Sequence, residues 1–278
     1  MIPCTPKTGE VQVLSEAVNL SSLYTTGYSQ IFVENRVDSI QPFVMGQYEV
    51  TQQLYSAVMG SNPSYFTSDV ATWETQELRP VEQVSWYDAV VFCNKLSQRM
   101  GLEPVYSKGG KTDTSGWGEV PASSDEGWNA ITCNWNANGY RLPTEAEWEL
   151  AARGGDPEEW AWHYDYAGSG IIDGVAWYSD NSSDKTHQVG RKSTYILELY
   201  DMSGNVWEWC WDRYDYYGGS DAIDADTPSG GADSGSYRVH RGGSWDTIAH
   251  YCEVTSRSGD NPLLRLNTVG FRLVRSAN

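Results

Sequence analysis

Aromatic residues and glycines constrain this chain more than any other feature of its sequence. Its 278 residues include 13 Trp, 18 Tyr and 27 Gly. Large rings bury much apolar surface per residue, and glycine allows turns in which other residues are strained. The sequence therefore predicts a core of aromatic anchors beneath many turns and irregular segments, where functional residues tend to gather.

The charge balance argues against two classes of partner. The chain has 19 Lys and Arg against 37 Asp and Glu, a formal net charge of −18. A negative surface repels phosphate backbones and anionic lipid headgroups. No apolar run approaches the ~20 residues of a membrane helix. We therefore expect no nucleic-acid partner and no direct insertion of this chain into a membrane.

The cysteines argue against a metal–thiolate cluster. They occur singly, without a Cys-x-x-Cys pair or a His pair at zinc spacing. An isolated cysteine is most often a small buried apolar residue. We expect this environment for all five, which are Cys4, Cys93, Cys133, Cys210 and Cys252.

Helix signals mark three segments. Thr144 and Glu147 form a capping box, and Gly154-Gly155 stops the helix that follows. The other two predicted helices span 52–59, between Thr51 and Gly60, and the segment from the Ser85 and Asp88 cap to just before Gly101.

Alternation of apolar residues outlines the strands, and small polar residues outline the loops. Two strands are expected between 30 and 48 with a break at Gln41-Pro42, and further strands at 130–135, 238–245 and 270–275. Long loops are expected at 106–128, 154–200 and 212–236. Without an internal repeat or a dividing linker, the sequence predicts a single α+β domain over 1–278, with 1–30 as an N-terminal extension.

Three motifs follow one another along the chain. They are GYRLPTEAEWELAARGG at 139–155, YDMSGNVWEW at 200–209, and RGGSW at 241–245 followed by GFRLV at 270–274. In this order they resemble the formylglycine-generating, sulfatase-modifying family, and the resemblance extends over about residues 31–275. It implies a C-type-lectin-like fold with small antiparallel sheets, few helices, long ordered loops and neighbouring chain ends. The motif tryptophans, Trp148, Trp207, Trp209 and Trp245, are expected to pin loops from within the core.

The same resemblance argues against an enzyme. The oxidases of the family hold copper with two cysteines, and the matching positions here are Thr247 and Cys252. A hydroxyl cannot supply the soft anionic sulfur that selects Cu(I). An iron site is not supported either, because the four histidines are scattered. We therefore expect no catalytic residue and no cofactor. The alternatives are a family oxidase or an enzyme that uses Cys252 with nearby His250.

A calcium site is implied at the second motif. The resemblance places its ligands at the carboxylates of Asp201 and Glu208 and the carbonyls of Gly204 and Val206, which are hard oxygen donors. The alternative is that Asp201 caps a turn while Glu208 pairs with an arginine. We assign no metal site.

The C-terminal region, 238–275, also resembles the variable proteins of diversity-generating retroelements, the treponemal ones above all. Their fixed landmarks appear as Gly242-Gly243-Ser244-Trp245, Ala249, Cys252, Val254, Arg257, Pro262, Arg265 and Gly270-Phe271-Arg272. The hypervariable positions implied between them are Asp246, Thr247, Ile248, His250, Tyr251, Leu263, Leu264, Leu266 and Asn267. Such systems randomise adenines in codons like AAC, which never yields Glu, Lys, Gln, Met or Trp. None of the nine positions carries one of these five residue types. Glu253, which follows Cys252, does carry one.

Three leucines follow a turn signal in this region. Leu263, Leu264 and Leu266 come directly after Gly259-Asp260-Asn261-Pro262, where a polar loop is expected. Apolar residues displayed on a loop suggest a binding surface. The alternative is that these leucines pack beneath the neighbouring strand at 270–275.

The sequence therefore predicts a non-enzymatic, receptor-like or adhesin-like protein that displays a variable ligand-binding surface on a lectin-type scaffold. We expect the ligand to be a protein or another macromolecule, since exposed mixed aromatic and aliphatic groups suit a broad surface. The expected location is the cell surface or the extracellular space, with any anchor in a segment outside this chain. A structural domain without a specific ligand is the remaining alternative.

Overall fold

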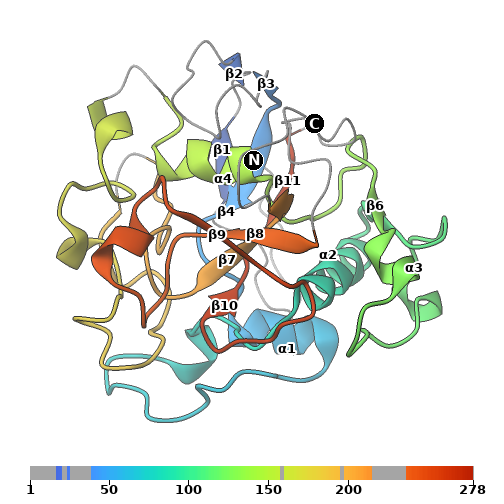
Figure 1. The fold of residues 1–278 in the computed structure, drawn as a ribbon, viewed down its shortest axis with the longest axis horizontal. Helices are drawn as coiled ribbons and strands as arrows, with labels where there is room; N and C mark the ends of the chain where they lie inside the picture. Colours follow the sequence, from blue (N-terminus) through green and yellow to red (C-terminus); the bar gives the residue numbers. More distant parts are fainter. Residues whose placement is uncertain are drawn as a thin grey trace.

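The strand β4 (Phe43–Gly46) joins the two ends of the described chain in one sheet. The computed structural model describes residues 17–20, 24–25, 39–156, 160–194, 197–214 and 236–277. Within them β4 pairs antiparallel with β1 (Ala17–Leu20) on one side and β11 (Val274–Ser276) on the other. The first and last described strands therefore flank one central strand (Figure 1), as the lectin-type fold implies.

A second sheet carries the C-terminal region. Its strand order is β10 (Val269–Gly270), β7 (Trp207–Tyr214), β8 (Tyr237–Arg241) and β9 (Arg257–Asp260). The β10–β7 pair is parallel and the others are antiparallel. Two small antiparallel pairs are formed by β2 (Tyr24–Thr25) with β3 (Ser39–Ile40), and by β5 (Tyr106–Ser107) with β6 (Thr132–Cys133).

The helices are short and few among the described residues. They are α1 (Gln52–Met59), α2 (Trp86–Arg99), α3 (Glu126–Asn129) and α4 (Glu145–Ala152), with 3₁₀ turns η1 (Gln76–Leu78), η2 (Thr114–Gly116), η3 (Trp160–His163), η4 (Ile172–Gly174) and η5 (Ala249–Cys252). Long ordered loops connect them (Figure 1). The predicted α+β class is confirmed. None of these helices is long and apolar enough to cross a membrane.

The helix predictions are confirmed by the caps. Both predicted capping boxes form, with the N-cap hydroxyl accepting from the N3 backbone N–H and the N3 carboxylate accepting from the N-cap N–H. Thr51 caps α1, and Gly60 ends it with a positive φ of 84°. Local hydrogen bonding was therefore enough to place these helices.

Several strand predictions were wrong in extent. The strand expected at 238–245 ends at Arg241, because Gly242 and Gly243 turn the chain with φ values of 97° and 79°. The strand expected at 270–275 is divided between β10 and β11. At 130–135 only Thr132–Cys133 is extended, and the expected turn at 259–262 begins inside β9. The expected strands between 30 and 48 correspond to β3 and β4, while 30–38 lies outside the described residues.

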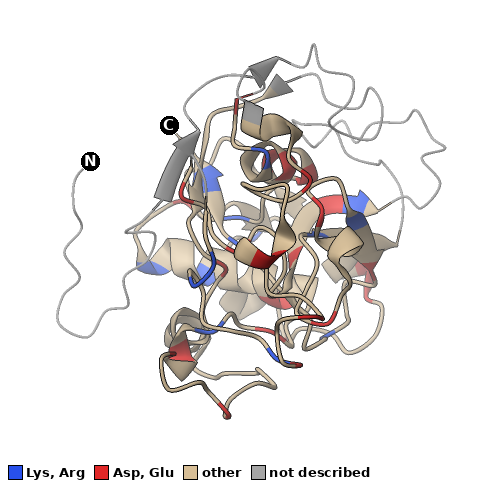
Figure 2. Ribbon diagram, turned by 90° about the vertical axis from the view of Figure 1, so that its left-hand side faces the viewer, with Lys and Arg blue, Asp and Glu red and all other residues tan. Residues whose placement is uncertain are grey.

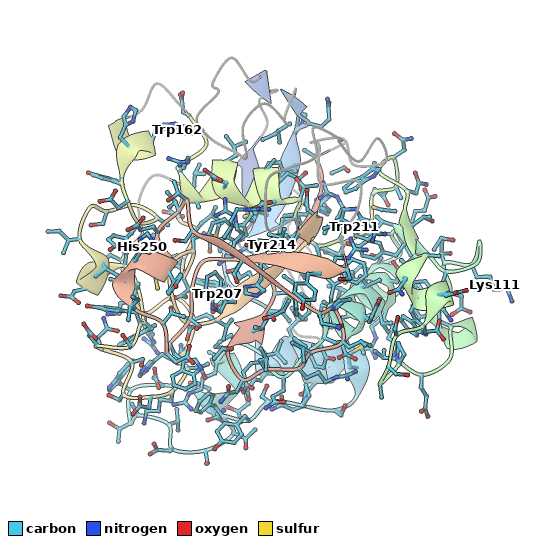
Figure 3. All side chains as sticks on the ribbon, viewed as in Figure 1. Lys111, Trp162, Trp207, Trp211, Tyr214 and His250 are labelled. Carbon is cyan, nitrogen blue, oxygen red and sulfur yellow. The ribbon has the colours of Figure 1, made fainter. Side chains whose placement is uncertain are left out.

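Buried tryptophans fasten the sheet to the helices. Trp86 donates from its indole to the carbonyl of Cys210 at 2.9 Å, and Trp209 donates to that of Val84 at 3.0 Å. Trp207 and Trp211 belong to β7 itself and are also buried (Figure 3). Because the indole N–H groups of Trp86 and Trp209 are both hydrogen-bonded, these rings bury apolar area without leaving a buried donor unpaired. Burial of Trp148, Trp207 and Trp209 is confirmed.

The described cysteines are all free thiols. Cys93, Cys210 and Cys252 are buried, and Cys133 is partly buried. The expected buried environment is thus confirmed for three of them, while Cys4 lies outside the described residues.

Lys and Arg positions are scattered among Asp and Glu over the described chain (Figure 2).

Arg272 is the cation at the centre of the fold. It is fully buried, contacts the Glu208 carboxylate on β7 at 2.7 Å, and donates to the carbonyls of Gly46 at 2.9 Å and Tyr200 at 2.7 Å. These bonds join the two larger sheets. Burial raises the pKa of neighbouring Asp201 to about 6. Burial, then the carboxylates of Asp201 and Glu208, also hold the pKa of Glu49 well above its usual range.

Replacing Arg272 by Met should destabilise the fold by about 3–5 kcal/mol, because it leaves buried carboxylates without their cation. Arg275→Met, at a partly exposed position on β11, should change stability by less than about 0.5 kcal/mol. Urea titrations of the two variants measure the difference. Equal stabilities would contradict the central role of Arg272.

The loss should also depend on pH. A carboxyl whose folded pKa is raised, like those of Glu49 and Asp201, stabilises the fold below its unfolded pKa, and that contribution is lost as pH rises through the folded value. Arg272 opposes the rise, because its charge lowers the pKa of both carboxyls, so Arg272→Met should cost more at pH 7, where they are more ionised, than at pH 4. A loss that grew on acidification would contradict this assignment.

Candidate functional site

A tight turn starts the candidate surface. After β8, Gly243 passes so close to Cys252 that a Cβ at this position would lie 2.6 Å from the thiol sulfur. The Thr247 hydroxyl donates to the carbonyl of Ser244 at 3.0 Å and accepts from its N–H at 3.0 Å. Asp246 accepts from the Ser244 hydroxyl at 2.7 Å. Glycine is thus sterically required here, and the side chains of Asp246 and Thr247 help to close the turn.

The residues present do not fit the copper centre that the family resemblance suggests. The Thr247 hydroxyl lies 3.4 Å from the Cys252 sulfur, so the two family positions are neighbours in space. Burial raises the pKa of Cys252 to about 11, so the thiol stays protonated at neutral pH. One neutral thiol beside a hydroxyl is not the thiolate pair that Cu(I) selects.

The Cys-His alternative also fails on geometry. Residues 249–252 form η5 rather than a strand, so His250 and Cys252 do not share a face. The His250 side chain is 70% exposed and contacts Glu253 at 3.0 Å, whereas Cys252 is fully buried. His250 therefore cannot serve as the base for this thiol.

The first group of predicted positions is displayed. Ile248 is 60% exposed and Tyr251 is 50% exposed, and both lie next to partly buried Ala249 or buried Cys252. Asp246 and His250 are also exposed, while Thr247 is partly buried. The chain therefore alternates between side chains that hold η5 in place and side chains that face solvent.

The second group follows β9 and is anchored at Pro262. This proline is buried, and its carbonyl accepts from the N–H of Trp86 at 3.1 Å. Leu264 and Leu266 are exposed, while Leu263 is partly buried and packs against the hydrophobic core. Leu264 and Leu266 therefore agree with the interpretation as displayed residues, and Leu263 agrees with the interpretation as a core residue. Asn267, the last position of the group, is partly buried.

Trp245 joins the two groups, and its expected burial was wrong. The ring is only half-buried. Its indole donates to the carbonyl of Asn267 at 3.0 Å, and the ring lies nearly perpendicular to that of Phe66 with ring centroids 5.2 Å apart. Trp245 is therefore a link at the surface. Figure 1 shows η5 and the loop after β9 in orange to red, with β9 between them.

Sequence reasoning passed over the segment 61–69, which lies against this link. Tyr65 is 65% exposed and packs edge-on against Phe66. Two adjacent aromatics inside a Ser-, Asn- and Asp-rich stretch were the available signal. Nothing in that stretch shows that it reaches Trp245, because the contact joins distant parts of the chain.

The implied calcium ligands do not form a cation site. Both oxygens of Glu208 are engaged, by Arg272 and by the indole of Trp148 at 2.7 Å. Arg272 therefore supplies the positive charge next to this carboxylate. Asp201 accepts from Gly190, and its other oxygen is buried without a partner among the described residues. Within that same part of the chain, no three His, Cys, Asp or Glu side chains converge to hold a metal.

Comparison with known families agrees with this architecture. The model of the sulfatase-modifying factor enzyme 1-like domain matches residues 8–277. The chain belongs to this family. The fold is similar to that of a solved structure, Treponema denticola variable protein 1, at 39% identity and a TM-score of 0.80 over 94% of both chains.

Curated proteins that are similar to this chain have diverse names. A chaperone protein, LppX, of Paenibacillus barcinonensis is 35% identical over 78% of this chain and 74% of its own length. The formylglycine-generating enzyme of Streptomyces coelicolor is 34% identical over 54% of this chain, and the matched part covers 51% of that enzyme's length. Membership in the family therefore fixes the fold and leaves the function to the site.

Restoring a thiol at position 247 should create the missing copper ligand pair. We expect the native protein to retain no Cu(I) against a competing chelator, and Thr247→Cys to retain about one equivalent, since its sulfur would lie beside that of Cys252. The double variant Thr247→Cys with Cys252→Ser is the control and should retain none. Tight Cu(I) binding by the native chain would contradict the assignment.

Proposed function

We propose that this protein is a non-enzymatic receptor-like or adhesin-like protein that binds a macromolecular ligand through side chains displayed by its C-terminal region, 238–275. The observation that carries the proposal is the display of large apolar groups at Ile248, Tyr251, Leu264 and Leu266 on segments whose backbone is tied to the core. Isolated exposed apolar residues are ordinary, but four in two joined segments favour a binding surface.

Two further observations support this function. The relationship to Treponema denticola variable protein 1 covers 94% of both chains. The thiol pair of the family oxidases is incomplete at Thr247, and the remaining thiol of Cys252 is buried and protonated. A thiol in this state is a poor nucleophile and a poor metal ligand, so an oxidase or a Cys252-dependent enzyme is not favoured.

The proposed ligand is a macromolecule, and the proposed location is the cell surface or the extracellular space. The displayed groups spread over two segments rather than lining a deep pocket, which suits a broad partner surface. The nine positions, from Asp246 to Asn267, would set the specificity. Thr247 and Leu263 should tolerate the fewest exchanges, because Thr247 closes a turn and Leu263 packs on the core.

Sequencing the coding region from independent natural isolates tests the proposal. We expect amino-acid differences to concentrate at the nine positions, with a nearby imperfect copy of the 3′ end that differs at adenines. A neighbouring reverse-transcriptase gene should accompany that copy. Invariance at the nine codons, or differences spread evenly over 238–275, would contradict a diversified binding surface.

A further inference from the structure

Three aromatic side chains form a continuous surface feature at the junction of the two displayed groups. Tyr65 meets Phe66 at a centroid distance of 5.0 Å, and Phe66 meets Trp245 at 5.2 Å, both edge-to-face. Trp245 directly precedes Asp246 and bonds Asn267. We call Tyr65, Phe66 and Trp245 the aromatic ledge. Only Trp245 belongs to the C-terminal region, so most of the ledge comes from another part of the chain.

Buried polar groups hold the ledge in place. The Glu82 carboxylate is fully buried and accepts from the backbone N–H of Tyr65 at 3.0 Å and of Phe66 at 2.9 Å. Gln52 and Gln76 donate to the carbonyl of Phe66 at 3.1 and 2.6 Å. Four hydrogen bonds from three side chains of the scaffold thus hold the backbone that carries an exposed tyrosine, which core packing does not require.

Rigid, exposed aromatic side chains are the groups that contribute most to protein–protein affinity. They bury a large area at small entropic cost, and the energy of an interface concentrates in a few such residues. On the basis of the proposed function, we propose that the aromatic ledge is a constant anchor of the binding surface. It contributes to every complex, while the neighbouring displayed positions select the partner.

The occupant that fits is a folded protein with a basic rim around an apolar patch. Asp246 is exposed beside Trp245, whereas exposed Asp69, three residues after Phe66, is already paired with Lys185 at 2.7 Å. The nearby Arg265 is already paired with Asp88 at 2.7 Å. With a net charge of −18, the chain favours approach of a positively charged surface.

A binding selection with a defined probe tests this proposal. Ile248, His250, Tyr251, Leu264 and Leu266 are randomised together in the full chain, and the library is selected against egg-white lysozyme, a basic protein. Parallel selections use acidic ovalbumin and a soluble mannan. Tyr65→Ala is then introduced into the lysozyme binders. Met100→Ala is the matched control, because Met100 is also an exposed apolar residue and lies at the opposite end of α2 from Asp88.

We expect lysozyme binders to emerge, to lose about tenfold or more in affinity with Tyr65→Ala, and to change less than about twofold with Met100→Ala. Tyr65→Phe should retain most of the affinity. If neither Tyr65→Ala nor Phe66→Ala lowered the affinity of the binders, the aromatic ledge would not be an anchor, and the proposed function would be unaffected. Equal recovery against ovalbumin, or recovery against mannan alone, would overturn the choice of a basic protein. Failure to obtain any binder would overturn the ledge together with the proposed function.

Discussion

The buried ion pair between Arg272 and Glu208 is the interaction on which the rest of this structure depends. It connects β7 with the last residue of β4 and with the backbone at Tyr200, so one guanidinium at the C-terminal end satisfies groups from two distant parts of the chain. A buried pair of this kind need not add much net stability, but neither partner can be lost alone. It therefore specifies how the two larger sheets meet, and with them the backbone that leads into the displayed segments.

In the C-terminal region, some residues hold the backbone in place and others display their side chains to solvent. Gly243 and Pro262 hold the backbone, the first by its close approach to Cys252 and the second through its carbonyl bond to Trp86. The exposed side chains of Ile248 and Leu264 contribute little to the core. Because the backbone is secured elsewhere, exchange of such side chains changes the surface chemistry without requiring a new fold. A scaffold for sequence variation needs this separation.

The sequence predicted what local chemistry decides and missed what distant contacts decide. Helix boundaries followed from the Thr144 cap and from Gly60, since these residues act within one turn. The solvent exposure of Ile248 also matched the landmark pattern. The half-burial of Trp245 could not be predicted, because its partner, Phe66, lies in a loop whose position depends on the buried carboxylate of Glu82. Strand ends were misjudged where glycines bend the chain.

The central claim is that the displayed positions can change while the scaffold stays folded. The most direct measurement is the unfolding free energy of a variant in which Ile248, Tyr251, Leu264 and Leu266 are all replaced by Ser. Each change removes an exposed side chain, so the total loss should stay under about 2 kcal/mol, compared with about 3–5 kcal/mol for Trp209→Ala in the core. If the fourfold variant lost as much stability as Trp209→Ala, these residues would belong to the core and the account of a displayed surface would be contradicted.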